Sequence, residues 1–196
     1  MRRFRRPQSL AELARPQRVA ALPAQVRILG LDLGSQRTGY AVVETQAGRI
    51  AYIVSGAIRT RGESLAERLQ EIFAGVAALA GEFRPDEVAI ERVFMHRNAD
   101  SALKLGQARG AAICAVFSAV PSLYEYAPRE VKQAIVGQGG AQKDQVQLMV
   151  RNLLRLRGEL GPDAADAIGL ALCHAYSRNA RCAIDAVDRA LQGAVP

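Results

Sequence analysis

The sequence predicts an α/β domain with a five-stranded mixed sheet, three antiparallel strands followed by two parallel ones, and helices on both faces. Two observations predict it. Residues 26–59 read as three consecutive apolar strands with turn residues between them, and residues 63–179 alternate between helical and strand patterns. Consecutive strands joined by tight turns pair antiparallel. Strands separated by helices pair parallel, and both faces of such a sheet must then be covered.

The first half of the domain is expected to contain the antiparallel strands and one helix. Strands are predicted at about 26–33, 38–45 and 49–59, where Gly34-Ser35 and Ala47-Gly48 supply the turns. Apolar residues then recur at helical spacing and predict a helix over about 63–82. Arg84-Pro85-Asp86 follows this helix, and proline cannot continue a helix.

The second half is expected to alternate strands and helices. A strand at 87–91 leads through a loop to a helix over 99–118, which Asn98 can cap. A short strand at 122–126 precedes a helix over 129–136, because Pro128 suits a first helical turn. A glycine-rich loop follows at 137–140. Helices over about 143–157 and 163–179 complete the domain, and residues after 180 look weakly helical.

Charge is unevenly distributed along the chain. Residues 1–27 hold seven arginines and one acid, and residues 92–157 hold ten basic groups and four acids. A basic middle region beside acidic residues elsewhere indicates a polyanionic partner. We expect a disordered Arg-rich extension at 1–26, one domain at 27–180 and a C-terminal tail at 181–196. The extension could instead be a transit peptide, a DNA-binding arm or a start site placed too early.

Other function classes are disfavoured by composition. No apolar run approaches the ~18 residues of a membrane-spanning helix, and the extension lacks the apolar core of a secretory signal. The three cysteines form no C-x-x-C pair, which argues against structural zinc and fits a reducing cytoplasm.

Four carboxylates carry the functional prediction. Asp32 and Glu91 each end an apolar strand, and Asp163 and Asp166 open a helix at i, i+3 spacing, which puts them on one helical face. Buried acids cost folding energy unless a cation lies among them. Hard oxygen ligands without a Cys or His set favour Mg²⁺ or Mn²⁺. Asp163 after Gly161-Pro162 could alternatively serve only as a helix cap.

Five blocks in order resemble the RuvC family of bacterial Holliday junction resolvases, in the ribonuclease-H-like and integrase superfamily. The resemblance covers about residues 27–178. The most specific block is 89–110, and the others are 28–40, 131–133, 137–147 and 163–167. Leu33 stands where the family usually has proline, in a turn and not at a ligand position.

The resemblance implies a homodimer that resolves four-way junctions in DNA recombination and repair by paired, symmetric phosphodiester hydrolysis. It implies Mg²⁺ dependence, with Mn²⁺ able to substitute and two ions per site, a bacterial cytoplasmic location, and the RuvA–RuvB branch-migration complex as partner. Metal would be held by Asp32, Glu91, Asp163 and Asp166. Two metals about 4 Å apart can activate water and stabilise the leaving oxygen.

The resemblance also suggests residues that contact DNA or the second subunit. Lys143 opens a helix, where a lysine opposes the helix dipole unless a phosphate binds there. It and Lys132 are implied as DNA-contacting or catalytic cations. Phe94 and Arg97 lie in a loop that would face DNA, where an aromatic ring can stack on unpaired bases.

Small residues predict a close helix contact. Ala102, Gly106 and Gly110 fall at i, i+4, i+8, and glycine inside a helix costs about 1 kcal/mol relative to alanine. The partner could be the domain's own sheet, or the second subunit, which the resemblance favours. His174 lies about 12 Å along the helix from Asp166, too far to share its metal, and is expected to be a packing residue.

Three other functions compete with this interpretation. The segment around Asp32-Leu-Gly resembles the phosphate-binding hairpin of actin-like and sugar-kinase-like ATPases, but the chain holds no second copy. The YqgF-like nucleases share the first motif, and activity on RNA would favour them. A non-catalytic junction-binding module gains nothing from clustered acids near phosphates.

Overall fold

The computed structural model describes residues 25–92, 99–120 and 122–192, with side chains as far as residue 184. The residues of the extension before Gln25 lie outside this range. The elements along the chain are β1 Gln25–Asp32, β2 Arg37–Gln46, β3 Arg49–Arg59, α2 Leu65–Phe83, β4 Glu87–Glu91, α3 Ala99–Phe117, β5 Leu123–Tyr126, α4 Pro128–Val136, α5 Lys143–Leu153 and α6 Pro162–Gln192.

The sheet confirms the predicted fold class. Its strand order is β3-β2-β1-β4-β5. The β1–β2 and β2–β3 pairs are antiparallel, and the β1–β4 and β4–β5 pairs are parallel. Strand β1 is therefore central and joins the antiparallel half to the parallel half. The two strands predicted to carry Asp32 and Glu91 are direct neighbours.

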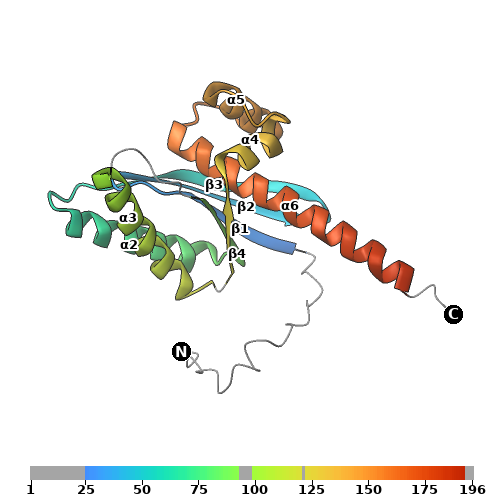
Figure 1. The fold of residues 1–196 in the computed structure, drawn as a ribbon, viewed down its shortest axis with the longest axis horizontal. Helices are drawn as coiled ribbons and strands as arrows, with labels where there is room; N and C mark the ends of the chain where they lie inside the picture. The colour runs from blue at the N-terminus through green and yellow to red at the C-terminus, as the bar shows by residue number, and fades with distance from the viewer. Residues whose placement is uncertain (1–24, 93–98, 121, 193–196) are drawn as a thin grey trace, which may run out of the picture.

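Helices cover both faces of the sheet (Figure 1). On one face α2 and α3 enclose a core that includes Leu29, Leu31, Val88 and Ile90, all buried. On the other face α6 lies across β1 and β2, with α4 and α5 against it. Side chains alternate between the two faces along a strand. Leu31 and Ile90 belong to the core under α2 and α3, so the next residues, Asp32 and Glu91, point toward the α6 face.

Two glycines let α6 approach the sheet closely. A side chain at Gly30 in β1 would collide with the backbone of Ala167, and one at Gly39 in β2 would collide with the backbone of Asp163. Both contacts are made by α6, at its first turn and one turn further along. The sequence at these two strand positions therefore fixes how near the beginning of α6 lies to the end of β1.

The last two helices differ from their predicted lengths. Helix α5 ends at Leu153 and not near residue 157, because Arg155 and Gly158 adopt left-handed backbone conformations with φ of 51° and 89°. Helix α6 continues to Gln192, past the predicted end at 179. Among the described residues no helix combines the length and apolarity needed to span a membrane.

Candidate active site

The strand register brings Asp32 and Glu91 together. Leu31 of β1 is paired with Ile90 of β4 in a parallel arrangement, so the residues that follow each of them end neighbouring strands side by side. Both side chains are half-buried. The predicted pairing of these two carboxylates at one edge of the sheet is confirmed.

Helix α6 adds its two aspartates to the same edge. Gly39 lies directly opposite Asp32 in the β1–β2 pair, and the backbone of Asp163 lies against Gly39. The first turn of α6 is therefore positioned beside the end of β1. Asp166 lies one turn further into the helix, and both aspartates raise the pKa of Asp32 through their charge.

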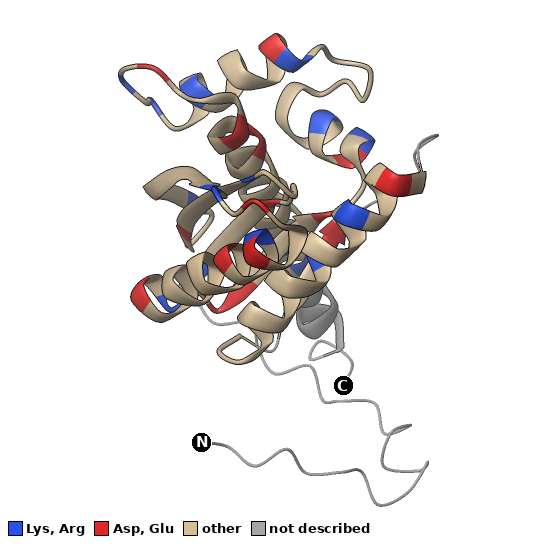
Figure 2. Ribbon diagram, turned by 90° about the vertical axis from the view of Figure 1, so that its left-hand side faces the viewer, with Lys and Arg blue, Asp and Glu red and all other residues tan. Residues whose placement is uncertain are grey.

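A cavity of about 230 Å³ opens at this edge, and five of the six predicted carboxylates and lysines line it. Its charged lining comes from Asp32, Glu91, Lys132, Lys143 and Asp166. Asp163 does not line this cavity but a neighbouring cleft. The beginning of α6 thus contributes one aspartate to each hollow. Figure 2 faces this end of the molecule and shows acidic and basic residues interspersed over it.

Asp32 is the electrostatically strained member of the group. Burial, and after it the negative charges of Asp166, Glu91 and Asp163, raise its pKa from the ordinary value of 3.8 to about 7, although Lys143 acts to lower it. A buried carboxyl among like charges retains its proton to higher pH. A divalent cation can take the place of that proton, which is the behaviour expected of a metal ligand.

Lys143 is ion-paired with one of the acids. Its Nζ lies 2.5 Å from Oδ2 of Asp166, and this hydrogen bond raises the pKa of Lys143. The lysine begins α5, after the loop that starts at Gly137. Lys143, expected as a DNA-contacting or catalytic cation, therefore lies beside the carboxylates, and it lines the same cavity.

Asp163 has a cation of its own. Nη1 of Arg37, at the beginning of β2, lies 3.8 Å from Oδ2 of Asp163. Both aspartates near the beginning of α6 are thus partly neutralised by a basic side chain. Among the described residues no three His, Cys, Asp or Glu side chains form a ready-made metal-binding group. The donor chemistry nevertheless fits a hard divalent cation, since carboxylate oxygens from three elements converge around Asp32.

Some predicted residues cannot be placed or lie elsewhere. Phe94, Arg97 and the expected helix cap Asn98 fall outside the described residues. On α3, Ala102 is half-buried, whereas Gly106 and Gly110 are exposed, and a Cβ on either glycine would meet no described atom within 4 Å. The domain's own sheet is therefore not the partner of the two glycines.

Two arginines near the site were not identified from the sequence. Arg37 belongs to the segment 28–40 that resembles the RuvC family, but its pairing with Asp163 depends on where α6 lies. Arg109 of α3 donates from Nη1 to the backbone carbonyl of Glu91 at 2.6 Å and forms an ion pair through Nη2 with Glu125 at 2.6 Å. Its side chain is only 15% exposed, so it braces the ends of β4 and β5.

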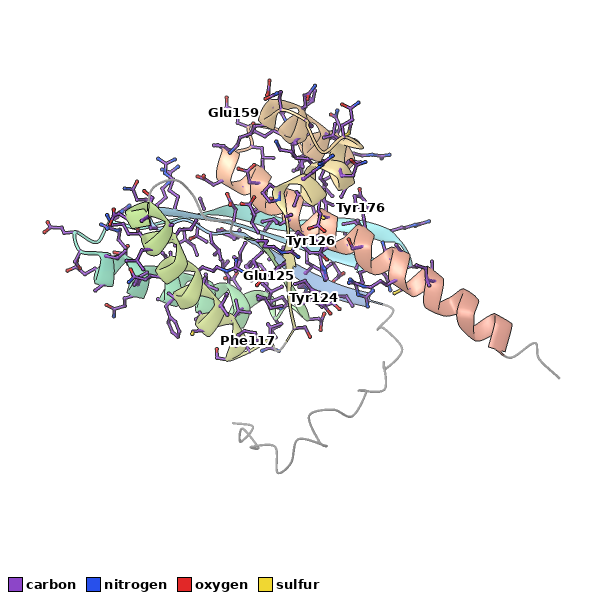
Figure 3. All side chains as sticks on the ribbon, viewed as in Figure 1. Phe117, Tyr124, Glu125, Tyr126, Glu159 and Tyr176 are labelled. Atoms are coloured by element: carbon purple, nitrogen blue, oxygen red, sulfur yellow. The ribbon has the colours of Figure 1, made fainter. Side chains whose placement is uncertain are left out.

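A buried network anchors α6 at a distance from the cavity. His174 is fully buried, and its Nδ1 and Nε2 lie 2.6 Å from the hydroxyl of Tyr126 and from Oε2 of Glu87, respectively. Arg178 donates to the other oxygen of Glu87 at 3.3 Å. Tyr124 and Tyr126 lie on β5 beside α6 (Figure 3). The prediction that His174 is a packing residue is confirmed.

Comparisons with known proteins agree on one family. A family model described as "Crossover junction endodeoxyribonuclease RuvC" matches residues 28–174. The protein of that name from Aeromonas hydrophila is 54% identical over 151 residues, which cover 77% of this chain and 87% of the relative. The one from Vibrio cholerae is 52% identical over 157 residues, which cover 80% and 91%, respectively.

Solved structures show the same similarity. Thermus thermophilus RuvC in complex with a Holliday junction substrate is 36% identical, with a TM-score of 0.72 over 79% of this chain and 96% of that chain. The yeast mitochondrial Holliday junction resolvase is 13% identical, with a TM-score of 0.57 over 88% of this chain and 91% of the other, and shares the fold.

Proposed function

The chain belongs to the RuvC family of crossover junction endodeoxyribonucleases, and from this premise we infer that it resolves four-way DNA junctions by hydrolysing phosphodiester bonds. The observation that carries this inference is the convergence of Asp32, Glu91, Asp163 and Asp166 at one edge of the sheet, next to a cavity that also holds Lys143. Four acids beside a polyanionic substrate are unfavourable unless they serve a cation.

The cation we propose is Mg²⁺, with Mn²⁺ able to substitute and two ions in each site. Asp32 and Glu91, with Asp163 and Asp166, would hold them. When bound, Mg²⁺ supplies a Lewis acid for the phosphoryl oxygens and a more acidic attacking water. Asp32 must give up its proton to act as a ligand, which its pKa of about 7 allows near neutral pH.

The basic residues of the cavity would act on the substrate phosphate. Lys143 holds its charge firmly, because Asp166 raises its pKa, so it would stabilise negative charge on the phosphoryl group and not accept a proton. Lys132, on the opposite helix α4, lines the same cavity and would contact a neighbouring phosphate. Phe94 and Arg97 would contact bases and backbone at the crossover.

A homodimer would supply the second, symmetric cut. The exposed face of α3 carries Leu103, Gly106, Gly110 and Phe117, of which Leu103 is 63% and Phe117 50% exposed. Their spacing of three, four and seven residues makes one apolar stripe. Helices approach closely where glycines face each other, so this stripe, with Ala102 at its edge, suits a second copy. We also propose that the protein acts in the bacterial cytoplasm, with the RuvA–RuvB branch-migration complex as its partner.

The test is cleavage of an immobile four-way junction in Mg²⁺, compared with a plain duplex of the same sequence and with EDTA. Paired, ligatable nicks on the junction alone are expected. Asp32→Asn should abolish cleavage and retain junction binding, whereas Asp144→Asn, which neutralises an exposed acid beside Lys143 but outside the cavity, should still cut. Junction binding by the wild-type protein without cleavage in Mg²⁺ or Mn²⁺ would contradict the enzymatic assignment.

A further inference from the structure

A second cleft, of about 370 Å³, lies between strands β2 and β3 and the segment 156–164. The first turn of α6 lines this cleft with Pro162, Asp163 and Ala164, and the following turns line the cavity described above with Asp166, Gly169 and Leu170, so the two hollows adjoin. The charged residues lining the second cleft are Arg37, Arg59, Arg157, Glu159 and Asp163. Glu159 lies shortly before the beginning of α6 (Figure 3).

The arginines of this cleft are placed at an electrostatic cost. Arg37 and Arg59 lie directly opposite each other in the antiparallel β2–β3 pair, and like charges directly opposite are destabilising. Arg37 is only loosely paired, with 3.8 Å to Asp163. Within the described part of the chain, Arg59 and Arg157 take part in none of the ion pairs. An anion between these side chains would remove the repulsion.

Hydroxyl groups extend the polar character of the cleft. Tyr52 and Ser55 of β3 line it, and their oxygens are 3.1 Å apart. The Tyr52 side chain is partly exposed, at 37%. Hydroxyls and guanidinium groups together are the side chains that bind phosphate oxygens in protein–DNA interfaces. The cleft therefore has the chemistry of a phosphate-binding surface and not that of an apolar ligand pocket.

We propose that this cleft binds the phosphodiester backbone of a DNA strand that continues from the reaction site past Asp163. Arg59 and Arg157 contact phosphates from the two walls, and Arg37 contacts the phosphate nearest to the carboxylates. The proposal rests on the junction-cleaving function, because it requires DNA in the neighbouring cavity. It extends the DNA-contacting surface beyond Lys132 and Lys143 to the β3 side of α6.

The test is the salt dependence of binding to an immobile four-way junction in EDTA, measured by fluorescence anisotropy between about 50 and 200 mM KCl. A plot of log K against log [salt] has a negative slope, and each lost phosphate contact should make this slope less negative by about 0.7–0.9. Arg59→Gln and Arg157→Gln should each show this change, and the double variant about twice as much. Arg49→Gln removes the same charge from the other end of β3 and should leave the slope unchanged.

The possible failures can be told apart. If the wild-type protein binds the junction no better than a duplex, the proposed function itself fails. If the wild type prefers the junction and both variants match Arg49→Gln in slope and affinity, the cleft assignment alone is overturned. The double variant could also keep the wild-type salt slope for the junction and lose binding to a poly-glutamate peptide. That result would assign the cleft to an acidic protein segment and would overturn the DNA proposal.

Discussion

Replacing Asp32 with asparagine should stabilise the metal-free protein, although it removes a central residue of the site. The folded protein holds the Asp32 carboxyl at a pKa of about 7, first through burial and then through Asp166 and Glu91, whereas an unfolded chain releases this proton near pH 4. Between these two values the folded state binds more protons than the unfolded state. The free energy of unfolding therefore falls as pH rises from about 4 to 7.

The size of the effect follows from the pKa. A rise from 3.8 to about 7, at about 1.4 kcal/mol for each pKa unit, corresponds to about 4 kcal/mol once the carboxyl is fully ionised. Structural relaxation and water entry reduce this figure, so we expect Asp32→Asn to be about 2–4 kcal/mol more stable than wild type at pH 8. Well below pH 4 the wild-type carboxyl is neutral in both states, and the electrostatic difference should disappear.

Urea unfolding in EDTA at pH 4, 6 and 8 measures this difference directly. Asp144→Asn, at an exposed acid of α5, controls for the general loss of one negative charge. Adding Mg²⁺ at pH 8 should stabilise the wild type more than Asp32→Asn, because ligand binding to the folded state raises its stability. A difference between the two proteins that is the same at every pH, or a destabilised variant at pH 8, would refute the electrostatic reasoning.

Three further predictions concern catalysis, base contact and assembly. Lys143→Ala should lower the single-turnover cleavage rate by about 10²–10³-fold, as for loss of one charge-stabilising donor, and an unchanged rate would exclude Lys143 from catalysis. Phe94→Ala should weaken junction binding by about 1–3 kcal/mol if the ring stacks on a base, as competition binding would show. Gly110→Arg should sediment as a monomer, whereas Asn152→Arg on α5, across the sheet, should remain dimeric; a dimeric Gly110→Arg would remove α3 from the interface.

The sheet was predictable because its signals are local. Apolar strands with Gly34-Ser35 and Ala47-Gly48 between them determine an antiparallel meander, and β3 and β4 begin and end at the predicted residues. The last two helices were less predictable. Apolar residues near Leu153 continue the helical pattern past the true end of α5, where the backbone at Arg155 turns left-handed, and the length of α6 carries no comparable stop signal.

The carboxylates of the site were predictable for a similar reason. An acid at the end of an apolar strand is visible in the sequence, and parallel strands bring such ends together. The contacts of Arg37 and Arg109 were not predictable, because they join residues that are far apart in the sequence. Arg37 pairs with Asp163 across more than a hundred residues of chain. Arg109 reaches Glu91 from α3, a helix in which the sequence pattern indicates only a row of small residues.

The beginning of α6 connects the cavity that contains Asp166 with the cleft that contains Asp163. Asp166 pairs with Lys143 on one side, and Asp163 pairs with Arg37 on the other. If Asp163 and Asp166 hold the proposed cations, the metal charge would weaken each ion pair, and each basic side chain would become more available to a DNA phosphate. Coupling between two ligands is reciprocal. Metal should therefore strengthen phosphate contacts in both hollows, and bound DNA should in turn raise the affinity of the carboxylates for metal.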